Sequence, residues 1–186
     1  MSVVYLPPES QTRLLRIARQ SLERYVLGSL RQNEKIEDPY LRTVAYGAFV
    51  SLHKATTLRG CVGTCVPTQP LYQLVTEMTE AAASRDRRMA PVRAAELGDI
   101  HIDISVLSGL ETAGDPLSLQ VGRHGLHVAR DDNRGVLLPQ VATQYGWDIR
   151  TFLEQTCIKA GLRKHAWQDR DTRVSSFTAL ILEECR

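Results

Sequence analysis

A cysteine set among glycines and close to an arginine is the part of this chain best suited to chemistry. Residues 58–64 read Leu-Arg-Gly-Cys-Val-Gly-Thr, with Cys61 between Gly60 and Gly63 and two positions after Arg59. Glycine is used where a backbone must bend or come very close to another group. Cysteine in such a setting is more often selected for reactivity than for packing. The segment is therefore predicted to form part of a functional site.

Two interpretations of Cys61 follow from its surroundings. A thiolate is favoured beside Arg59 and near backbone amides left accessible by glycine, so Cys61 is a candidate nucleophile or ligand contact. The plain alternative is that Cys61 is a small residue that fits a crowded position. A nucleophilic thiol usually works with a histidine base. The candidate bases are His53, His101, His124, His127 and His165.

A metal site is weighed as a third interpretation. Cys61 and Cys65 are four residues apart, which is about 13 Å along an extended strand, so they cannot chelate one ion unless the chain folds back. A structural zinc site needs four ligands, usually from two closely spaced pairs. The second cysteine pair is missing, although His53 and His101 could contribute. No metal and no other cofactor are predicted.

The same segment is also a candidate anion site. The amide groups of Gly60 to Thr64 and the guanidinium of Arg59 suit a phosphate, sulfate or carboxylate. The glycine spacing is that of neither a P-loop nor a dinucleotide fingerprint. The alternative is that Arg59 pairs with Asp86 or Glu77 and only joins parts of the fold.

The hydrophobic pattern predicts the elements that hold this segment. Residues 43–53 alternate as a strand, residues 58–66 run back as a glycine-broken strand, and helical spacing begins near Pro70. Further along the chain, the pattern predicts a helix over 8–28, a strand over 100–107, a hairpin over 125–138, a helix over 148–161 and a strand over 173–183. Short turns between neighbouring strands favour an α+β fold with a largely antiparallel sheet flanked by helices.

Composition limits the class of protein further. The chain has 186 residues, 43% of them hydrophobic, and a net charge of +2. Its length fits one domain, and its charge gives no support for tight nucleic-acid binding. The amino terminus lacks the pattern of a signal peptide, and no apolar run reaches the roughly 20 residues of a membrane span. A cytoplasmic protein with reduced cysteines is expected.

Four blocks, in order along the chain, are similar to those of one known family. They are residues 58–64, residues 121–126, residues 135–142 with 146–148 and 152–153, and residues 157–162 with Trp167. On these blocks the chain resembles the AMMECR-type family, also called AmmeMemoRadiSam system protein A, from about residue 18 to the end. One block departs from the family pattern: Asp-Pro-Arg-Phe is replaced by Asp-Arg-Arg-Met at residues 86–89, which keeps Asp86 and Arg88.

The resemblance implies a fold and a place for the site. It implies one family domain over residues 1–186, with a larger lobe that holds both termini and a smaller lobe inserted within about residues 45–95. It also implies a cleft between the lobes that is lined by motif residues. Relatives are often encoded beside, or fused to, a Memo-like protein and a radical S-adenosylmethionine protein, which implies shared pathway partners rather than a particular reaction.

Two functional hypotheses are carried forward. The first is an enzyme, or a binder of a small molecule or anion, that is centred on Cys61. In this hypothesis the ligand contacts are Arg59, Gly60, Gly63, Thr64, Asp86, Arg88, His124 and Gln140. The alternative is a non-catalytic module that binds the Memo-like and radical S-adenosylmethionine proteins, with the motif acting as a rigid recognition turn.

Overall fold

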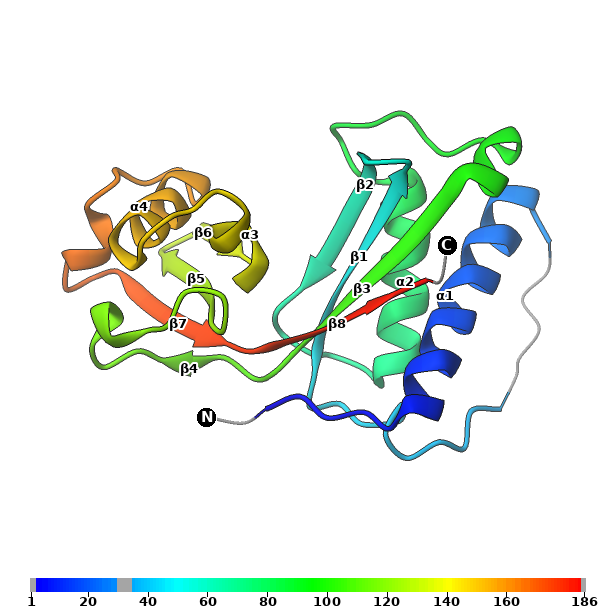
Figure 1. The fold of residues 1–186 in the computed structure, drawn as a ribbon, viewed down its shortest axis with the longest axis horizontal. Helices are drawn as coiled ribbons and strands as arrows, with labels where there is room; N and C mark the ends of the chain where they lie inside the picture. Colours follow the sequence, from blue (N-terminus) through cyan, green and yellow to red (C-terminus); the bar gives the residue numbers. More distant parts are fainter. Residues whose placement is uncertain (1–2, 30–34, 185–186) are drawn as a thin grey trace. The chain divides into compact units, whose positions relative to one another are not determined.

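The computed structural model describes residues 3–29 and 35–184, and these form two compact units (Figure 1). The larger unit contains Val4–Leu107 and residues 180–184, and the smaller contains Ser108–Ala179 together with Val3. Each unit has its own hydrophobic core. Both units combine an antiparallel sheet with helices, which confirms the predicted α+β class.

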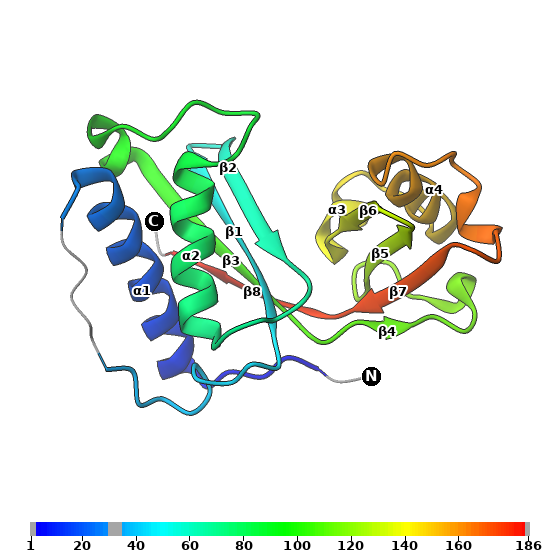
Figure 2. The same cartoon turned by 180° about the vertical axis from the view of Figure 1, so that it is seen from behind.

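The larger unit is a four-stranded sheet with two helices on one of its faces. The strand order is β2-β1-β3-β8. Figures 1 and 2 show α1 and α2 side by side against the same face of this sheet. The elements are α1 (Pro8–Leu27), β1 (Gly47–Lys54), β2 (Thr57–Thr64), α2 (Leu71–Ser84), the 3-10 helix η1 (Ala94–Asp99), β3 (Ile100–Leu107) and β8 (Ala179–Glu183).

The sequence alternation decides which side chains enter this core. Val50 and Leu52 of β1 and Ile102 and Ile104 of β3 are fully buried and face the helices. These positions alternate with polar ones because successive side chains of a strand point to opposite faces. Gly28 ends α1 in the left-handed conformation, with a φ of 66°, as the sequence predicts.

The opposite face of this sheet carries no helix among the described elements of the larger unit. We call it the helix-free face and define it by Cys61 of β2, Ser51 and His53 of β1, and His101 and Asp103 of β3. The side chains of all five are partly exposed. Reactive and titratable groups therefore occupy the face that the core of this unit does not use.

The smaller unit is a second antiparallel sheet, of order β4-β7-β5-β6, with α4 packed on β5 and β6. Asp148 caps α4 by accepting a hydrogen bond from the Thr151 N–H group, and Cys157 lies in the core, both as predicted. The elements are β4 (Glu111–Thr112), η2 (Pro116–Ser118), β5 (Gly125–Arg130), β6 (Asn133–Leu137), α3 (Pro139–Gln144), α4 (Ile149–Lys159), η3 (Ala166–Gln168) and β7 (Arg173–Phe177).

The structure differs from the sequence analysis in where the chain divides. Residues 45–95, the expected smaller lobe, lie inside the larger unit, because β1 and β2 pair with β3 and α2 packs on them. The separate unit is 108–179 instead. The strand predicted over 173–183 is two strands, β7 and β8, that join different sheets.

Smaller details concern the segments around these elements. Thr68 is the residue type expected to cap the helix near Pro70, but Pro70 itself stands at the start of α2, with no side-chain cap. Residues 31–39 are polar and end in a proline, which predicts a loop, and part of this segment lies outside the described residues. Cys185 and the first two residues also lie outside them. None of the described helices is long and apolar enough to cross a membrane.

Candidate functional site

The two glycines of the motif allow close packing inside the larger unit. A Cβ atom on Gly60 would lie 2.2 Å from the carbonyl oxygen of Ala82 in α2. A Cβ atom on Gly63 would lie 2.3 Å from the Phe49 ring and 2.5 Å from the Ala48 carbonyl oxygen. The close approach predicted from glycine is real, and here it is made by protein groups of the same unit.

The Cys61 side chain is placed by this packing. Gly60 faces α2, so Cys61, the next residue of β2, points to the helix-free face. Its Sγ lies 3.2 Å from the Oγ of Ser51, the residue directly opposite on β1. A thiol and a hydroxyl are thus side by side on a partly exposed surface.

The backbone of Cys61 is held from the outer edge of the sheet. Its N–H group donates to Asp86 Oδ2 at 2.9 Å, and its carbonyl oxygen accepts from Arg88 Nη2 at 3.4 Å. β2 is an edge strand, whose outward N–H and C=O groups lack a neighbouring strand. Asp86 and Arg88 therefore take the place of that strand at the position of the thiol.

Asp86 and Arg88 also bind each other through three hydrogen bonds. Arg88 Nε and Nη2 donate to the carboxylate at 2.9 and 2.7 Å, and the Arg88 backbone N–H donates at 3.1 Å. The Asp86 side chain is 5% exposed, whereas that of Arg88 is 60% exposed. The hydrogen bonds from Arg88, with that from Cys61, hold the pKa of Asp86 far below its ordinary range despite its burial.

A histidine and an aspartate form a second polar pair on the helix-free face. His53 Nε2 lies 3.2 Å from Asp103 Oδ2. Asp103 is directly opposite Ser51 across β1 and β3, so Cys61, Ser51 and Asp103 form one row across three strands. Burial raises the pKa of Asp103, and His53 acts against that rise.

Arg59 is aimed away from this row by a β-bulge. The register of β1 and β2 shifts between Leu52 and His53, which leaves Arg59 as the extra residue of β2. Its Nε and Nη2 donate to the Glu96 carboxylate at 2.8 and 3.0 Å. Nη1 donates to the Ala90 carbonyl oxygen and Nη2 to that of Pro91.

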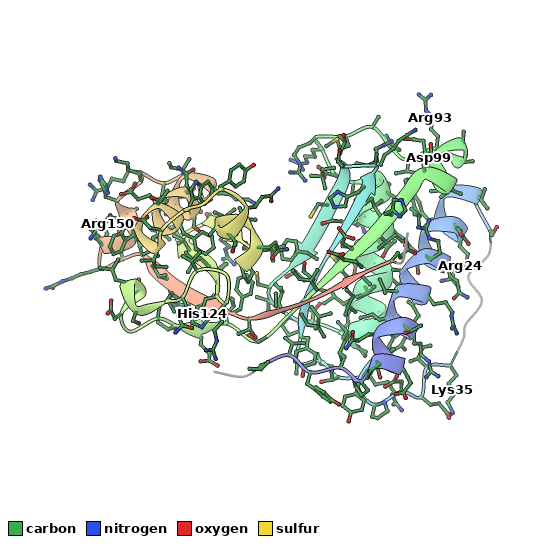
Figure 3. The ribbon with its side chains drawn as sticks, viewed as in Figure 1. Arg24, Lys35, Arg93, Asp99, His124 and Arg150 are labelled. Atoms are coloured by element: carbon green, nitrogen blue, oxygen red, sulfur yellow. The ribbon has the colours of Figure 1, made fainter. Side chains whose placement is uncertain are left out.

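These contacts change the interpretation of Arg59. Its partner is Glu96, not Asp86 or Glu77, and its donors are largely used within the protein. Arg59 and the hydrogen bond from the Arg93 N–H group lower the pKa of Glu96 to about 2. Figure 3 labels Arg93 and Asp99, which bracket this 3-10 turn. Arg59 thus connects β2 to η1. Because these contacts use most of its donors, they do not favour its predicted role as an anion ligand.

Replacing Arg59 with lysine tests this fastening. Arg59→Lys keeps the charge but loses the two-pronged contact, so we expect the free energy of unfolding to fall by about 2 kcal/mol at pH 7. The depressed pKa of Glu96 means that its stabilising contribution is complete above about pH 4.5 and is lost as the pH falls toward 2. Urea unfolding at pH 7 and pH 3 should show that the free energy of unfolding falls less on acidification in the variant than in the wild type.

The control for Arg59→Lys is Arg85→Lys, because Arg85 is exposed and lies 3.9 Å from its partner Glu77. We expect this control to change stability by less than about 0.5 kcal/mol. Phosphate should raise the melting temperature of the wild-type protein and of Arg59→Lys equally. A normal stability combined with a lost phosphate effect would restore Arg59 as an anion ligand.

Two of the three further candidates, Thr64 and His124, have local roles in the structure. Thr64 Oγ1 donates to the Val66 carbonyl oxygen and accepts from the Val66 N–H group, closing a turn after β2. His124, labelled in Figure 3, accepts the Gln120 N–H on Nδ1 at 2.9 Å and is buried, which lowers its pKa. Gln140 Oε1 is buried without a hydrogen-bond partner. His124 and Gln140 belong to the smaller unit, whereas the other candidates belong to the larger.

The described cysteines differ in their burial. Cys61, Cys65 and Cys157 are free thiols. Burial raises the pKa of Cys65 from 9.0 to about 12 and also raises that of Cys157. Within residues 3–29 and 35–184, no group of three or more His, Cys, Asp or Glu side chains is placed to hold a metal ion.

Sequence reasoning did not include Ser51 and Glu96 among the candidates. Ser51 occupies a polar position in the alternation of β1, but only the strand register places it opposite Cys61. Glu96 pairs with Arg59 across 37 residues, and no local pattern indicates such a partner. His53 and His101 were candidate bases, and both lie on the helix-free face.

The fold and the site together define a class: an α+β protein of two antiparallel-sheet units, with a thiol on an edge strand beside a carboxylate–guanidinium pair. The model of the AMMECR1 family matches residues 15–182. The chain therefore belongs to the AMMECR1 family. A relative from Methanothermobacter thermautotrophicus is 41% identical over 179 residues, covering 92% of each chain. A relative from Thermococcus onnurineus is 40% identical over 185 residues, covering 92% of this chain and 88% of the relative.

A solved structure supports the fold as well as the family. The crystal structure of protein PH0010 from Pyrococcus horikoshii matches with a TM-score of 0.89 at 35% sequence identity. The match covers 96% of this chain and 93% of that one. The shared architecture therefore extends over both units.

Proposed function

We propose that this protein is an enzyme that uses the thiol of Cys61 on an electrophilic small molecule. The observation that carries the proposal is the position of Cys61 Sγ, 3.2 Å from Ser51 Oγ on the helix-free face, while Asp86 and Arg88 hold the backbone of the same residue. A nucleophile must be accessible and fixed in direction to react efficiently. Both conditions are met at Cys61.

The hydrogen bonds around Cys61 determine which donors could stabilise a reacting group. The Cys61 N–H is used by Asp86, so it does not serve as a donor to a developing oxyanion. The Ser51 hydroxyl is the donor within reach of the sulfur. The Arg88 guanidinium, largely exposed, places a positive charge in the neighbourhood of the sulfur.

Gln140 and His124, which belong to the smaller unit, are proposed as ligand contacts of that unit. Gln140 has a buried carbonyl oxygen without a partner, which a donor group of a ligand would satisfy. His124 uses Nδ1 for the Gln120 N–H, which leaves Nε2 for a ligand. An anionic group of the substrate would meet Arg88 rather than Arg59.

Cysteine profiling of the folded protein tests the proposal. The native protein is treated with iodoacetamide at pH 7 for increasing times, and each cysteine is quantified by mass spectrometry. The raised pKa of Cys65 reduces its thiolate fraction roughly a thousandfold relative to an ordinary thiol. We expect Cys61 to be alkylated at least about a hundredfold faster than Cys65 and Cys157.

The same experiment with iodoacetate, the anionic analogue, tests the charge at the site. A positive field from Arg88 should make the iodoacetate-to-iodoacetamide rate ratio higher at Cys61 than in a short unfolded peptide containing that cysteine. If Cys61 reacts as slowly as Cys157, the thiol proposal is overturned. The function proposed would then be the alternative, a partner-binding module that acts with Memo-like and radical S-adenosylmethionine proteins.

A further inference from the structure

We infer that the smaller unit binds a phosphate-type oxyanion between Arg134 and Arg173, on the face of its sheet opposite α4. The ligand is the free ion or the phosphate group of a small molecule. The site lies within the smaller unit, and it is independent of the function proposed for Cys61 in the larger unit. It is carried by the strand register, which places two arginines and a histidine on one face of three neighbouring strands.

The burial pattern of the sheet decides which face is left for a ligand. Val128 of β5 and Val174 of β7 are buried in the core that α4 covers. Gly135 of β6 is buried as well, and a Cβ atom there would lie 2.5 Å from the Thr156 carbonyl oxygen of α4. The α4 side of the sheet is therefore filled by the core. The residues before and after these three point to the opposite face, because successive side chains of a strand alternate.

The register brings the ligand-binding side chains together on that opposite face. Arg134 of β6 and Arg173 of β7 are both directly opposite Ala129 of β5, which lies between them. Two strand spacings separate their backbones, about 9.6 Å, a span that two long arginine side chains can close around one oxyanion. Both arginines are exposed and Ala129 is partly exposed. The small side chain of Ala129 thus forms an accessible floor between two guanidinium groups.

The donors of the two arginines are not used within the protein. In the described part of the chain, no hydrogen bond or ion pair joins Arg134 or Arg173 to another residue. Asp131 and Asp132, in the turn between β5 and β6, also make no ion pair with either of them. By contrast Arg130, on the α4 side of β5, donates to a carboxylate at 2.6 Å. Guanidinium groups without a carboxylate can bind phosphate oxygens through charge-assisted hydrogen bonds.

His127 adds a hydrogen-bond donor beside the arginines. It lies two residues before Ala129 on β5, so it is on the same face and about 6.8 Å along the strand. Its Nδ1 is buried without a hydrogen-bond partner, and we therefore assign the proton of the neutral ring to Nε2. The ring is partly exposed, so the Nε2–H group can donate to a ligand.

The charges on this face match a phosphate dianion. Burial lowers the pKa of His127, and the nearby charges of Arg134 and Arg173 lower it further, so the ring is neutral at pH 7. The face therefore presents two positive charges and one neutral donor. A phosphate dianion would balance both charges and accept from all three side chains.

Binding of inorganic phosphate to the full chain tests this site. Isothermal titration calorimetry at pH 8 and constant ionic strength measures the affinity, with chloride as the blank, and the NMR signals of the His127 ring report the place of binding. We expect saturable binding with a Kd of about 1 mM or lower, and a shift of the His127 signals. Arg134→Gln and Arg173→Gln should each weaken binding about tenfold, because each removes a charge-assisted contact. Ala129→Glu, which puts a carboxylate between the guanidinium groups, should abolish binding.

Arg150→Gln is the matched control. Arg150, labelled in Figure 3, is an exposed arginine of α4, which covers the other face of the sheet. Its substitution removes the same charge from the same unit and should change the affinity less than about twofold. Phenyl phosphate is titrated in parallel. Tighter binding than that of inorganic phosphate identifies the ligand as an ester, and weaker binding identifies it as the free ion.

The outcomes separate this site from the thiol proposal. The anion site is overturned if phosphate shows no saturable binding, if Arg150→Gln weakens binding as much as Arg134→Gln, or if phosphate leaves the His127 signals unchanged. The rate of Cys61 alkylation, measured in the same variants, should stay at the wild-type value whether or not phosphate binds. Urea unfolding of each variant verifies that the compared proteins are folded.

Discussion

Gly60→Ala is expected to lower the free energy of unfolding by about 3 kcal/mol or more, because overpacking against a backbone cannot be relieved by a rotamer change. The new Cβ atom would lie 2.2 Å from the carbonyl oxygen and 3.1 Å from the carbonyl carbon of Ala82. To remove this contact, α2 must move away from β2. Urea unfolding monitored by circular dichroism measures the loss directly.

Gly98→Ala is the matched control. A Cβ atom on Gly98 would meet no atom within 4 Å, and the backbone there is not left-handed. This variant should keep the wild-type stability to within about 0.5 kcal/mol. Because the displaced helix leads to Asp86, Gly60→Ala should also change the rate of Cys61 alkylation. Wild-type stability in Gly60→Ala would show that α2 does not pack on β2 as described.

Asp86→Ala is expected to cost about 3 kcal/mol of stability at pH 7. The substitution removes a nearly buried carboxylate that accepts hydrogen bonds from Cys61 and Arg88, and it leaves those donors unpaired. The lowered pKa of Asp86 means that its contribution is complete above its ordinary value of 3.8 and is lost as the pH falls below it. The wild type should therefore lose more stability than Asp86→Ala between pH 5 and pH 2.5.

The control for Asp86→Ala is Asp99→Ala. Figure 3 labels Asp99. Asp99 also pairs with a cation, Lys54 at 3.0 Å, but its side chain is 61% exposed. Exposed ion pairs contribute between zero and about 1 kcal/mol, so this variant should be close to the wild type. Equal effects of the two substitutions would mean that the carboxylate of Asp86 does not hold the edge of β2.

The elements of the fold could be predicted from the sequence because their periodicity is local. The alternation of β3 over residues 100–107 gives both its bounds and its buried face, and α1 is marked by its apolar stripe and Gly28. The division of the chain could not be predicted in this way. Periodicity identifies strands but does not say which sheet they join. The family resemblance implied a separate lobe within about residues 45–95, but β1 of this range pairs with β3.

Only part of the candidate site could be predicted from the sequence, because strand pairing is not visible in a local pattern. The residue types around Cys61 indicated reactivity, but its neighbours depend on register, and a slip of one residue would send every side chain to the other face. The bulge at Leu52 and His53 sets the pairing that puts Ser51 opposite Cys61 and turns Arg59 toward Glu96. No local pattern in the sequence predicts that bulge.

The connection between β3 and β8 has a consequence for how the chain folds. The two strands are neighbours in one sheet, and all of Ser108–Ala179 lies between them in sequence. Ser108 and Thr178 are joined by two hydrogen bonds, from the Ser108 N–H to the Thr178 carbonyl oxygen and from the Thr178 N–H to Ser108 Oγ. The smaller unit is thus inserted in the sequence between two neighbouring strands of the larger unit.

Once the smaller unit has folded, β8 pairs with β3 across a short hydrogen-bonded connection instead of a long flexible loop, whose closure entropy would slow the pairing. Folding of the smaller unit therefore brings β8, the last strand of the larger unit, next to β3. Damage to the core around Phe152 and Leu153 would then delay completion of the sheet that carries Cys61, although neither residue belongs to that sheet.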